Sequence, residues 1–227
     1  MNARLLATLA AGLLSVAPAL AHDGAPHRPE LAIGRSAAFD YDPPAPGSYR
    51  LAAIKAAADA EVLDHRGRRV SLGGLLAGKV TVMAFIYTRC ADVCPLATVL
   101  LHEIRGITAL DATLSGAVQL VTLSFDPEND TPEVMAMQAA GLEHLGEGAP
   151  WHFLTTDGLR ALRPILDAYG QPLARNGGEY AHELRVFLVD PARRIRNIYS
   201  VGFLDPRMVV TDVRTLLGES ARQAAVR

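Results

Sequence analysis

The clearest feature of the chain is a series of short apolar runs separated by amphipathic stretches. Residues 79–87 and 118–124 are continuous runs rich in β-branched residues, a pattern typical of strands buried on both faces. Three shorter strands are predicted over residues 151–155, 184–189 and 195–200. A tight turn at Asp190-Pro191-Ala192-Arg193 joins the last two strands into a hairpin.

Helical periodicity fills most of the intervals between these strands. Pro95 suits the first turn of a helix whose apolar face we expect to contain Leu96, Val99, Leu100, Ile104 and Ile107. After the loop at 126–132, a second helix has a predicted inner face of Val134, Met137, Gly141, Leu142 and Leu145. Two more helices are predicted, one over 157–169 ending near Gly170, and one bearing Val209, Val213, Leu216 and Leu217.

The resulting order is β-α-β-α-β-α-β-β-α, which predicts an α/β fold. Strands that alternate with helices form parallel crossovers, and the late β-hairpin makes the sheet mixed. This order fits a thioredoxin-like mixed sheet flanked by helices, with insertions. In such open sheets, functional sites gather at the carboxyl ends of the strands.

The composition favours one exported domain. The 227 residues are 50% apolar with a formal charge of -2 and no basic block, which argues against nucleic acid as a partner. Leu5 to Val16 is an apolar run followed by Ala19-Leu20-Ala21, so residues 1–21 are predicted to be a cleaved signal peptide. We expect the periplasm as destination, with membrane attachment only if the signal stays uncleaved.

The rest of the chain divides into three predicted segments. Proline-rich residues 22–48 are expected to form a flexible linker, residues 49–218 the thioredoxin-like domain, and residues 219–227 a C-terminal tail. If the signal is cleaved after Ala21, His22 becomes the N-terminus, where an amine and an imidazole can chelate copper. We favour an ordinary processing remnant for His22.

The two cysteines of the chain, Cys90 and Cys94, lie between a predicted strand and a predicted helix. Residues four apart on a helix are about 6 Å apart, so the two sulfurs can share a metal ion or form a disulfide. A helix N-terminus favours negative charge, so we expect it to lower the thiol pKa. An inert structural disulfide is the alternative, although so short a loop gains little entropy on closure.

A metal site needs more than two thiolates, so we looked for further ligands among the polar residues near the strand ends. His182 precedes a predicted strand and follows Asn176-Gly177-Gly178, a loop that could approach the cysteine pair. Asp126 follows the strand at 118–124 and is a candidate to hydrogen-bond a thiol or ligand, or simply to shape a turn. Two thiolates and one imidazole suit Cu(I), tolerate Cu(II) and could also hold Zn(II) with a water.

Three motifs resemble the Sco/SenC family of copper chaperones. Cys90-Ala-Asp-Val-Cys94-Pro95 resembles the family's Cys-x-x-x-Cys-Pro motif, and residues 126–132 resemble its Asp-Pro-x-x-Asp-Thr-Pro loop. His182, followed by Phe187-Leu-Val-Asp-Pro191, resembles the family's metal-binding histidine and the strand after it. The resemblance implies a thioredoxin-like fold and one copper ion per chain, bound by Cys90, Cys94 and His182.

The resemblance also implies a partner. It predicts that the protein delivers copper to, or reduces cysteines of, the copper-bearing subunit of cytochrome c oxidase, or serves another copper-receiving protein, with a thioredoxin-like protein as reductant. The competing hypothesis is an enzyme, a metal-independent thiol-disulfide oxidoreductase that uses Cys90 and Cys94. Thioredoxins space their cysteines by two residues and have a cis-proline where His182 stands here, which favours the metal-binding hypothesis.

Overall fold

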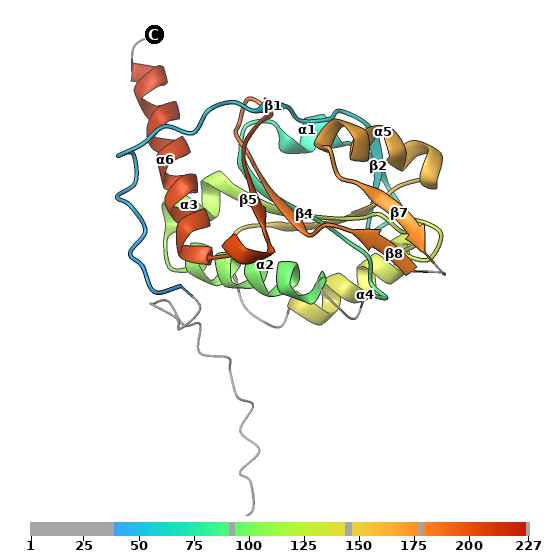
Figure 1. Ribbon diagram of the computed structural model, residues 1–227. Coiled ribbons are helices and arrows are strands. Elements are labelled where there is room, and N and C mark those ends of the chain that lie inside the picture. Colours follow the sequence, from blue (N-terminus) through green and yellow to red (C-terminus); the bar gives the residue numbers. More distant parts are fainter. Residues whose placement is uncertain (1–38, 91–93, 144–146, 177–178, 226–227) are drawn as a thin grey trace, which may run out of the picture. The chain divides into compact units, whose positions relative to one another are not determined.

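The computed structural model describes residues 39–90, 94–143, 147–176 and 179–225, and its elements are labelled in Figure 1. The strands are β1 (Lys55–Ala56), β2 (Glu61–Asp64), β3 (Arg69–Ser71), β4 (Val80–Ile86), β5 (Val118–Ser124), β6 (Trp151–Thr155), β7 (Leu173–Asn176), β8 (Glu179–His182), β9 (Arg185–Val189) and β10 (Arg194–Ser200). The helices are α1 (Leu72–Leu76), α2 (Cys94–Ala109), α3 (Ala112–Ala117), α4 (Pro132–Glu143), α5 (Leu159–Tyr169), the 3-10 turn η1 (Val201–Phe203) and α6 (Pro206–Ala225).

Eight of these strands form one mixed sheet in the order β1-β10-β9-β4-β5-β6-β2-β3, and β7 and β8 form a separate hairpin. Strands β4, β5 and β6 are parallel, whereas β9 runs antiparallel to β4. Every residue of β4 and β5 is buried, which explains their continuous apolar sequence. The predicted α/β fold with a mixed sheet and the late hairpin, β9–β10, is confirmed.

Helices cover both faces of the sheet (Figure 1). On one face, the Phe85 ring of β4 packs edge-on against Tyr169 of α5, with 5.3 Å between ring centroids. On the other, α2 buries Leu101 and Ile104 completely. Gly170 ends α5 in the left-handed conformation, as the sequence predicted.

Two helices bury a different face from the one we predicted. In α4 the fully buried residue is Met135, whereas Met137 has 67% of its surface exposed. In α2, Leu100 and Ile104 are buried as expected, but Leu96 and Val99 are exposed. Both helices have apolar residues on more than one side, so periodicity alone could not select the face that meets the sheet.

The ends of the described chain pack against the domain. Within residues 39–48, expected to be linker, the backbone oxygen of Phe39 accepts a hydrogen bond from Arg207, and the backbone amide of Gly47 donates one to Thr215 at 2.9 Å. Residues 219–225, expected to be a tail, continue helix α6. The expected signal peptide and His22 lie outside the described residues. Within the residues that are described, no helix is both long and apolar enough to cross a membrane.

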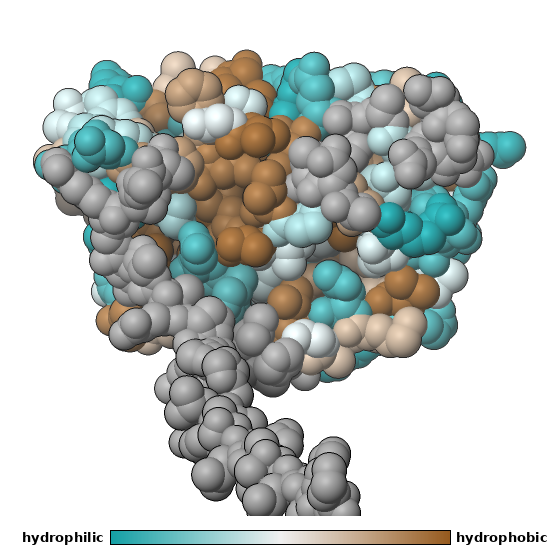
Figure 2. All heavy atoms as spheres, turned by 60° about the horizontal axis from the view of Figure 1, so that its bottom comes forward, coloured by the Kyte–Doolittle hydropathy of each residue, from teal (hydrophilic) through white to brown (hydrophobic). Residues whose placement is uncertain are grey.

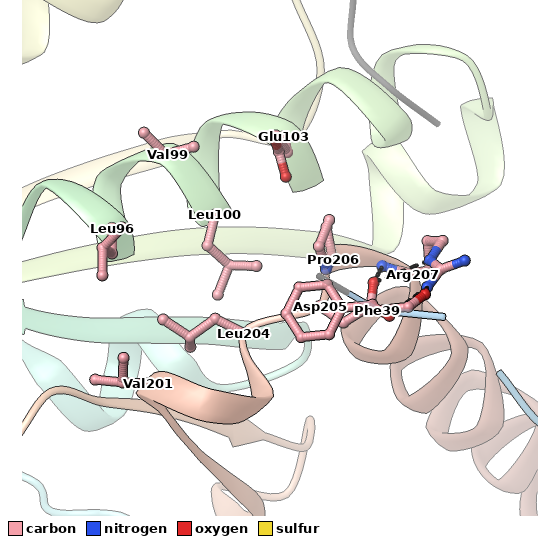
Figure 3. A pocket seen from close by; sticks show the side chains of 10 residues that line it. All are labelled: Phe39, Leu96, Val99, Leu100, Glu103, Val201, Leu204, Asp205, Pro206 and Arg207. Atoms are coloured by element: carbon pink, nitrogen blue, oxygen red, sulfur yellow. Dashed lines mark hydrogen bonds and ion pairs between the residues drawn. The ribbon is translucent and has the colours of Figure 1, made fainter. Parts of the chain in front are cut away.

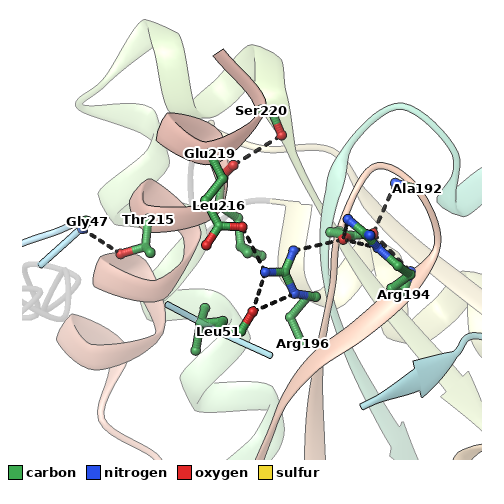
Figure 4. A network of polar contacts seen from close by, with 10 residues as sticks. Gly47, Leu51, Ala192, Arg194, Arg196, Thr215, Leu216, Glu219 and Ser220 are labelled. Carbon is green, nitrogen blue, oxygen red and sulfur yellow. Dashed lines mark hydrogen bonds and ion pairs between the residues drawn. The ribbon is translucent and has the colours of Figure 1, made fainter. Parts of the chain in front are cut away.

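A buried ionic network joins the β9–β10 hairpin to α6 (Figure 4). The Arg196 guanidinium, 8% exposed, lies 2.9 Å from the Asp190 carboxylate and 2.7 Å from Glu219 of α6. Its Nε also donates to the backbone oxygen of Leu51 at 3.0 Å. The same Asp190 carboxylate closes the turn by accepting hydrogen bonds from the backbone amide and the side chain of Arg194. One carboxylate therefore holds the turn and orients the buried arginine.

Replacing Asp190 by alanine should lower the free energy of unfolding by about 3 kcal/mol, because it leaves the buried Arg196 guanidinium with one carboxylate partner, Glu219, in place of two. Urea denaturation measures this change. Arg214→Ala is the matched control, because the Arg214–Asp111 pair is 3.5 Å apart with both side chains at least a third exposed. We expect it to cost less than about 1 kcal/mol. Equal losses in the two variants would contradict the assigned role of Asp190.

The same carboxylate should make stability depend on pH. Burial acts to raise the pKa of Asp190, but hydrogen bonds from Arg194 and Arg196 outweigh it and hold the pKa below its ordinary value of 3.8. Its contribution is therefore complete above about pH 4 and is lost as the pH falls through the folded-state pKa. Denaturation between pH 2 and pH 7 should show this loss in the wild type and a smaller one in Asp190→Asn.

Candidate functional site

The two cysteines lie where the sequence placed them, at the carboxyl end of β4. The strand ends at Ile86, and the backbone amide of Cys90 donates to the carbonyl of Tyr87 at 3.2 Å, which turns the chain towards α2. Cys94 is the first residue of α2. The two cysteines form no disulfide and are buried, with exposures of 9% for Cys90 and 4% for Cys94. The pair is therefore a reduced dithiol at the edge of the sheet.

Burial changes the expected acidity of this pair. It raises the pKa of the Cys94 thiol well above its ordinary range, and a hydrogen bond with the Cys90 side chain raises it further. A backbone hydrogen bond with Tyr87 acts in the opposite direction but is weaker. The prediction that the pKa of this thiol is lowered is wrong for Cys94, because desolvation by burial is the largest influence and raises it.

Asp130 fixes the loop that leads to Cys90. Its carboxylate, fully buried, accepts a hydrogen bond from the backbone amide of Thr88 at 3.0 Å and another from the Thr88 hydroxyl. The hydroxyl of Ser124, the last residue of β5, donates to the same carboxylate. Because β4 and β5 pair in parallel with Ile86 opposite Ser124, both strands end beside Asp130. The end of β5 thus determines the path of the chain towards Cys90.

Asp126 is the second fully buried carboxylate at this edge of the sheet. It accepts hydrogen bonds from the guanidinium of Arg89 at 2.8 Å and from the hydroxyl of Tyr180 at 3.2 Å. Asn129 donates to both of its oxygens at 3.0 Å. Arg89 is adjacent to Cys90, and Tyr180 is two residues from His182. Asp126 therefore links the segments that contain the predicted ligands.

The hairpin β7–β8 brings His182 to this edge of the sheet in place of the loop that we expected. His182 is the last residue of β8 and pairs with Leu173 of β7. The structure describes its backbone but not the position of its side chain. The signal for a hairpin was present, because Gly177-Gly178 separates two short segments as a two-residue turn does.

Aromatic packing anchors the hairpin to the central strands. The ring of Tyr180 lies 5.5 Å from Tyr87, after β4, and 5.6 Å from Phe125, after β5, between ring centroids. Tyr87 and Phe125 are themselves 5.1 Å apart. Sequence reasoning did not identify Tyr180. The signal that could have found it is its position, because residues two apart in a strand lie on the same face, and Tyr180 is two residues before His182.

The side chains that the structure describes do not contain a group of three or more His, Cys, Asp or Glu residues able to hold a metal ion. Two predicted ligands, Cys90 and Cys94, are together. The other described histidine side chains lie in the turn after β2 (His65), in α2 (His102) and in β6 (His152). Burial, with a smaller effect from Lys79, lowers the pKa of His152, which keeps it neutral as a packed residue.

Comparison with known proteins yields a family match over most of the domain. The family model described as SCO1/SenC matches residues 52–218. No curated protein matches the chain.

The solved structures of Sco proteins share the fold. Apo Sco1 from Thermus thermophilus is 28% identical, covers 76% of this chain and 97% of its own, and has a TM-score of 0.58. ScoI from Bradyrhizobium japonicum, solved with copper bound, is 23% identical, with coverages of 71% and 99% and a TM-score of 0.57. BsSco, described as having a disulfide switch and as a member of the Sco family of cytochrome c oxidase assembly proteins, is 22% identical, with coverages of 74% and 98% and a TM-score of 0.62.

These structures confirm the predicted thioredoxin-like fold. The family model covers nearly the whole described domain, including the cysteine pair, the loop with Asp126 and Asp130, and the hairpin that ends at His182. The chain belongs to the SCO1/SenC family.

Proposed function

We propose that this protein is a periplasmic copper chaperone that binds one copper ion per chain through Cys90, Cys94 and His182. It delivers this ion to the copper-bearing subunit of cytochrome c oxidase. Residues 1–21 act as the export signal, and residues 22–38 lead from it to the domain. The observation that carries the proposal is the pair of reduced thiols at the sheet edge, linked through Asp126 to the strand that ends at His182.

The donor set suits a soft, thiophilic ion. Two sulfurs and one imidazole match the preference of Cu(I), and they can hold Cu(II) as well. Metal binding must displace the thiol protons, because a raised pKa keeps Cys94 protonated at neutral pH. The free energy of the metal–sulfur bonds offsets this cost for copper more readily than for hard cations. Copper bound to the solved ScoI relative supports the same assignment.

Asp126 acts in this proposal as a positioning residue. Its hydrogen bonds to Arg89 and Tyr180 fix the chain next to Cys90 and the strand that ends at His182 relative to each other. The sequence left open whether Asp126 contacts a thiol or ligand or only shapes a turn; its partners Arg89 and Tyr180 are close in sequence to Cys90 and His182. A buried carboxylate with several donors is rigid, because each lost hydrogen bond would leave a desolvated oxygen.

The second candidate function is a thiol-disulfide oxidoreductase that works without metal. The observation that favours it is the hydrogen bond between the two reduced cysteine side chains, which places them close enough to form a disulfide. A thioredoxin-like protein would then restore the dithiol. This function requires the cysteines but not His182, which makes the two candidates separable.

Metal titration tests the ligand set. The reduced wild type should bind one Cu(I) per chain, and with Cu(II) it should show a thiolate-to-copper absorption band. Cys90→Ser and Cys94→Ser should abolish the band, and His182→Ala should weaken Cu(I) binding by about tenfold or more, because each removes a direct ligand. Competition with a chromophoric chelator measures the affinity.

His65→Ala is the matched control, since it removes a histidine from a polar turn and should leave both readouts unchanged. Wild-type copper affinity in His182→Ala would refute the three-ligand site. Reduction of protein disulfides by the metal-free protein, equally fast in His182→Ala, would favour the oxidoreductase.

Asp126→Ala should loosen the hairpin without unfolding the sheet. It removes the acceptor for both Tyr180 and Arg89, so the amides of β7 and β8 should exchange hydrogen about tenfold faster or more. Tyr180→Phe should have a smaller effect in the same direction, because the aromatic packing remains. Hydrogen exchange followed by mass spectrometry measures these rates, with β9 as the internal reference. Unchanged exchange in β8 of Asp126→Ala would show that the hairpin does not depend on this carboxylate.

A further inference from the structure

An apolar groove lies between α2 and the segment that joins η1 to α6, and we call it the α2–η1 groove. Figure 3 shows its side chains, and Figure 2 shows an extended apolar surface on the side of the molecule that lies at the bottom of Figure 1. Its volume is about 280 Å³, enough to admit an apolar side chain of another molecule. Its apolar lining includes Leu96, Val99, Leu100, Val201 and Leu204.

Packing within the domain does not explain this surface. Leu100 is buried and forms part of the core, but Leu96 is 46% exposed and Val99 is 53% exposed. Across the groove, Val201 is 46% exposed, and Phe203 of the same 3-10 turn is 71% exposed. These four side chains make up half of the large apolar residues that the described chain leaves exposed. Apolar side chains gathered in this way are typical of an interaction site.

The groove also contains a carboxylate, Glu103, that has no cationic partner among the described residues. Asp205 is paired with Arg207 at 2.8 Å, whereas no hydrogen bond or ion pair connects Glu103 to any other described residue. Burial raises the pKa of Glu103, and the nearby Asp205 raises it further. A partner that covers the groove would therefore benefit from placing a lysine or arginine beside Glu103.

The groove is near enough to the thiols to fall within one interface. Helix α2 begins at Cys94, and at 1.5 Å per residue Glu103 lies about 14 Å further along the helix axis. A standard interface covers about 800 Å² per partner, which corresponds to a disc of about 16 Å radius. A protein that docks over the cysteine pair can therefore reach the α2–η1 groove within the same interface.

A second copy of this chain is a poor occupant. A two-fold dimer places the same patch of both subunits together, which would bring one Glu103 towards the other, and the cation among the described lining residues, Arg207, is already paired with Asp205 at 2.8 Å. A different protein with a basic side chain among apolar ones has no such conflict.

We propose that the α2–η1 groove is the docking surface for the copper-receiving protein, whose apolar side chains contact Leu96, Val99 and Val201 and whose lysine or arginine pairs with Glu103. This inference rests on the proposed function, because it assigns to the groove the partner that takes copper from Cys90 and Cys94. It separates the surface that recognises the partner from the residues that hold the ion.

The test measures binding of the copper-loaded full-length mature protein to the metal-free exported domain of the copper-bearing oxidase subunit. The double variant Leu96→Asp/Val99→Asp should weaken binding by about tenfold or more, since it places charges in the apolar part of the interface. Glu103→Lys should also weaken it, and its binding should respond less to added salt. The matched control is Met137→Asp, which changes an apolar side chain of similar exposure on α4 and should leave the affinity within about twofold.

Cu(I) affinity and thermal melting are measured on every variant and should match the wild type, because no substituted residue belongs to the metal site. If the double variant does not fold, Val99→Ser and Glu103→Lys test the same surface. Wild-type affinity in the groove variants would overturn the docking inference and leave the proposed function intact. No binding by the wild type itself would overturn both.

Other occupants would give different results. A wild-type dimer in sedimentation that Leu96→Asp/Val99→Asp dissociates would assign the groove to a second copy and contradict the inference. Faster hydrogen exchange in α2 on removing residues 22–37, with partner affinity unchanged, would assign the groove to the chain's own N-terminal arm and would contradict the inference too.

Discussion

A carboxylate removed from water must be surrounded by hydrogen-bond donors, and this requirement determines how the segments of this protein meet. Asp126, Asp130 and Asp212 are fully buried, and each collects donors from more than one segment. Asp212, for example, accepts hydrogen bonds from Tyr49, near the start of the described chain, and from Tyr199 of β10. Because these donors are far apart in the sequence, the hydrogen bonds of each carboxylate form only when the chain folds and brings the segments together.

At the candidate site, the buried carboxylates position the chain, and the two cysteines provide the sulfur atoms. Cys90 and Cys94 are held in an apolar environment that keeps Cys94 protonated, whereas the ionic groups lie one layer further out, in Asp126, Asp130 and Arg89. Selectivity for a soft ion then follows from the sulfurs themselves.

The sequence was sufficient for the central strands, because β4 and β5 are long runs rich in apolar and β-branched residues, and for the end of α5 at a glycine. It was sufficient for the positions of Cys90 and Cys94, because a strand end and a helix start are local features. It failed where several faces of one helix are apolar, as with Met135 and Met137 in α4. It also failed for the acidity of Cys94, since desolvation depends on residues distant in the sequence.

Helix α6 has a practical consequence for anyone who shortens this protein. The family match ends at residue 218, yet Glu219 lies beyond it and neutralises Arg196 in the interior, 2.7 Å away. A recombinant chain that stopped at residue 218 would lose this partner and the last turns of the helix, and would place a terminal carboxylate beside the gap. Expression boundaries drawn from sequence similarity alone would thus remove Glu219 from the buried ionic network. The helix is therefore better kept to residue 225.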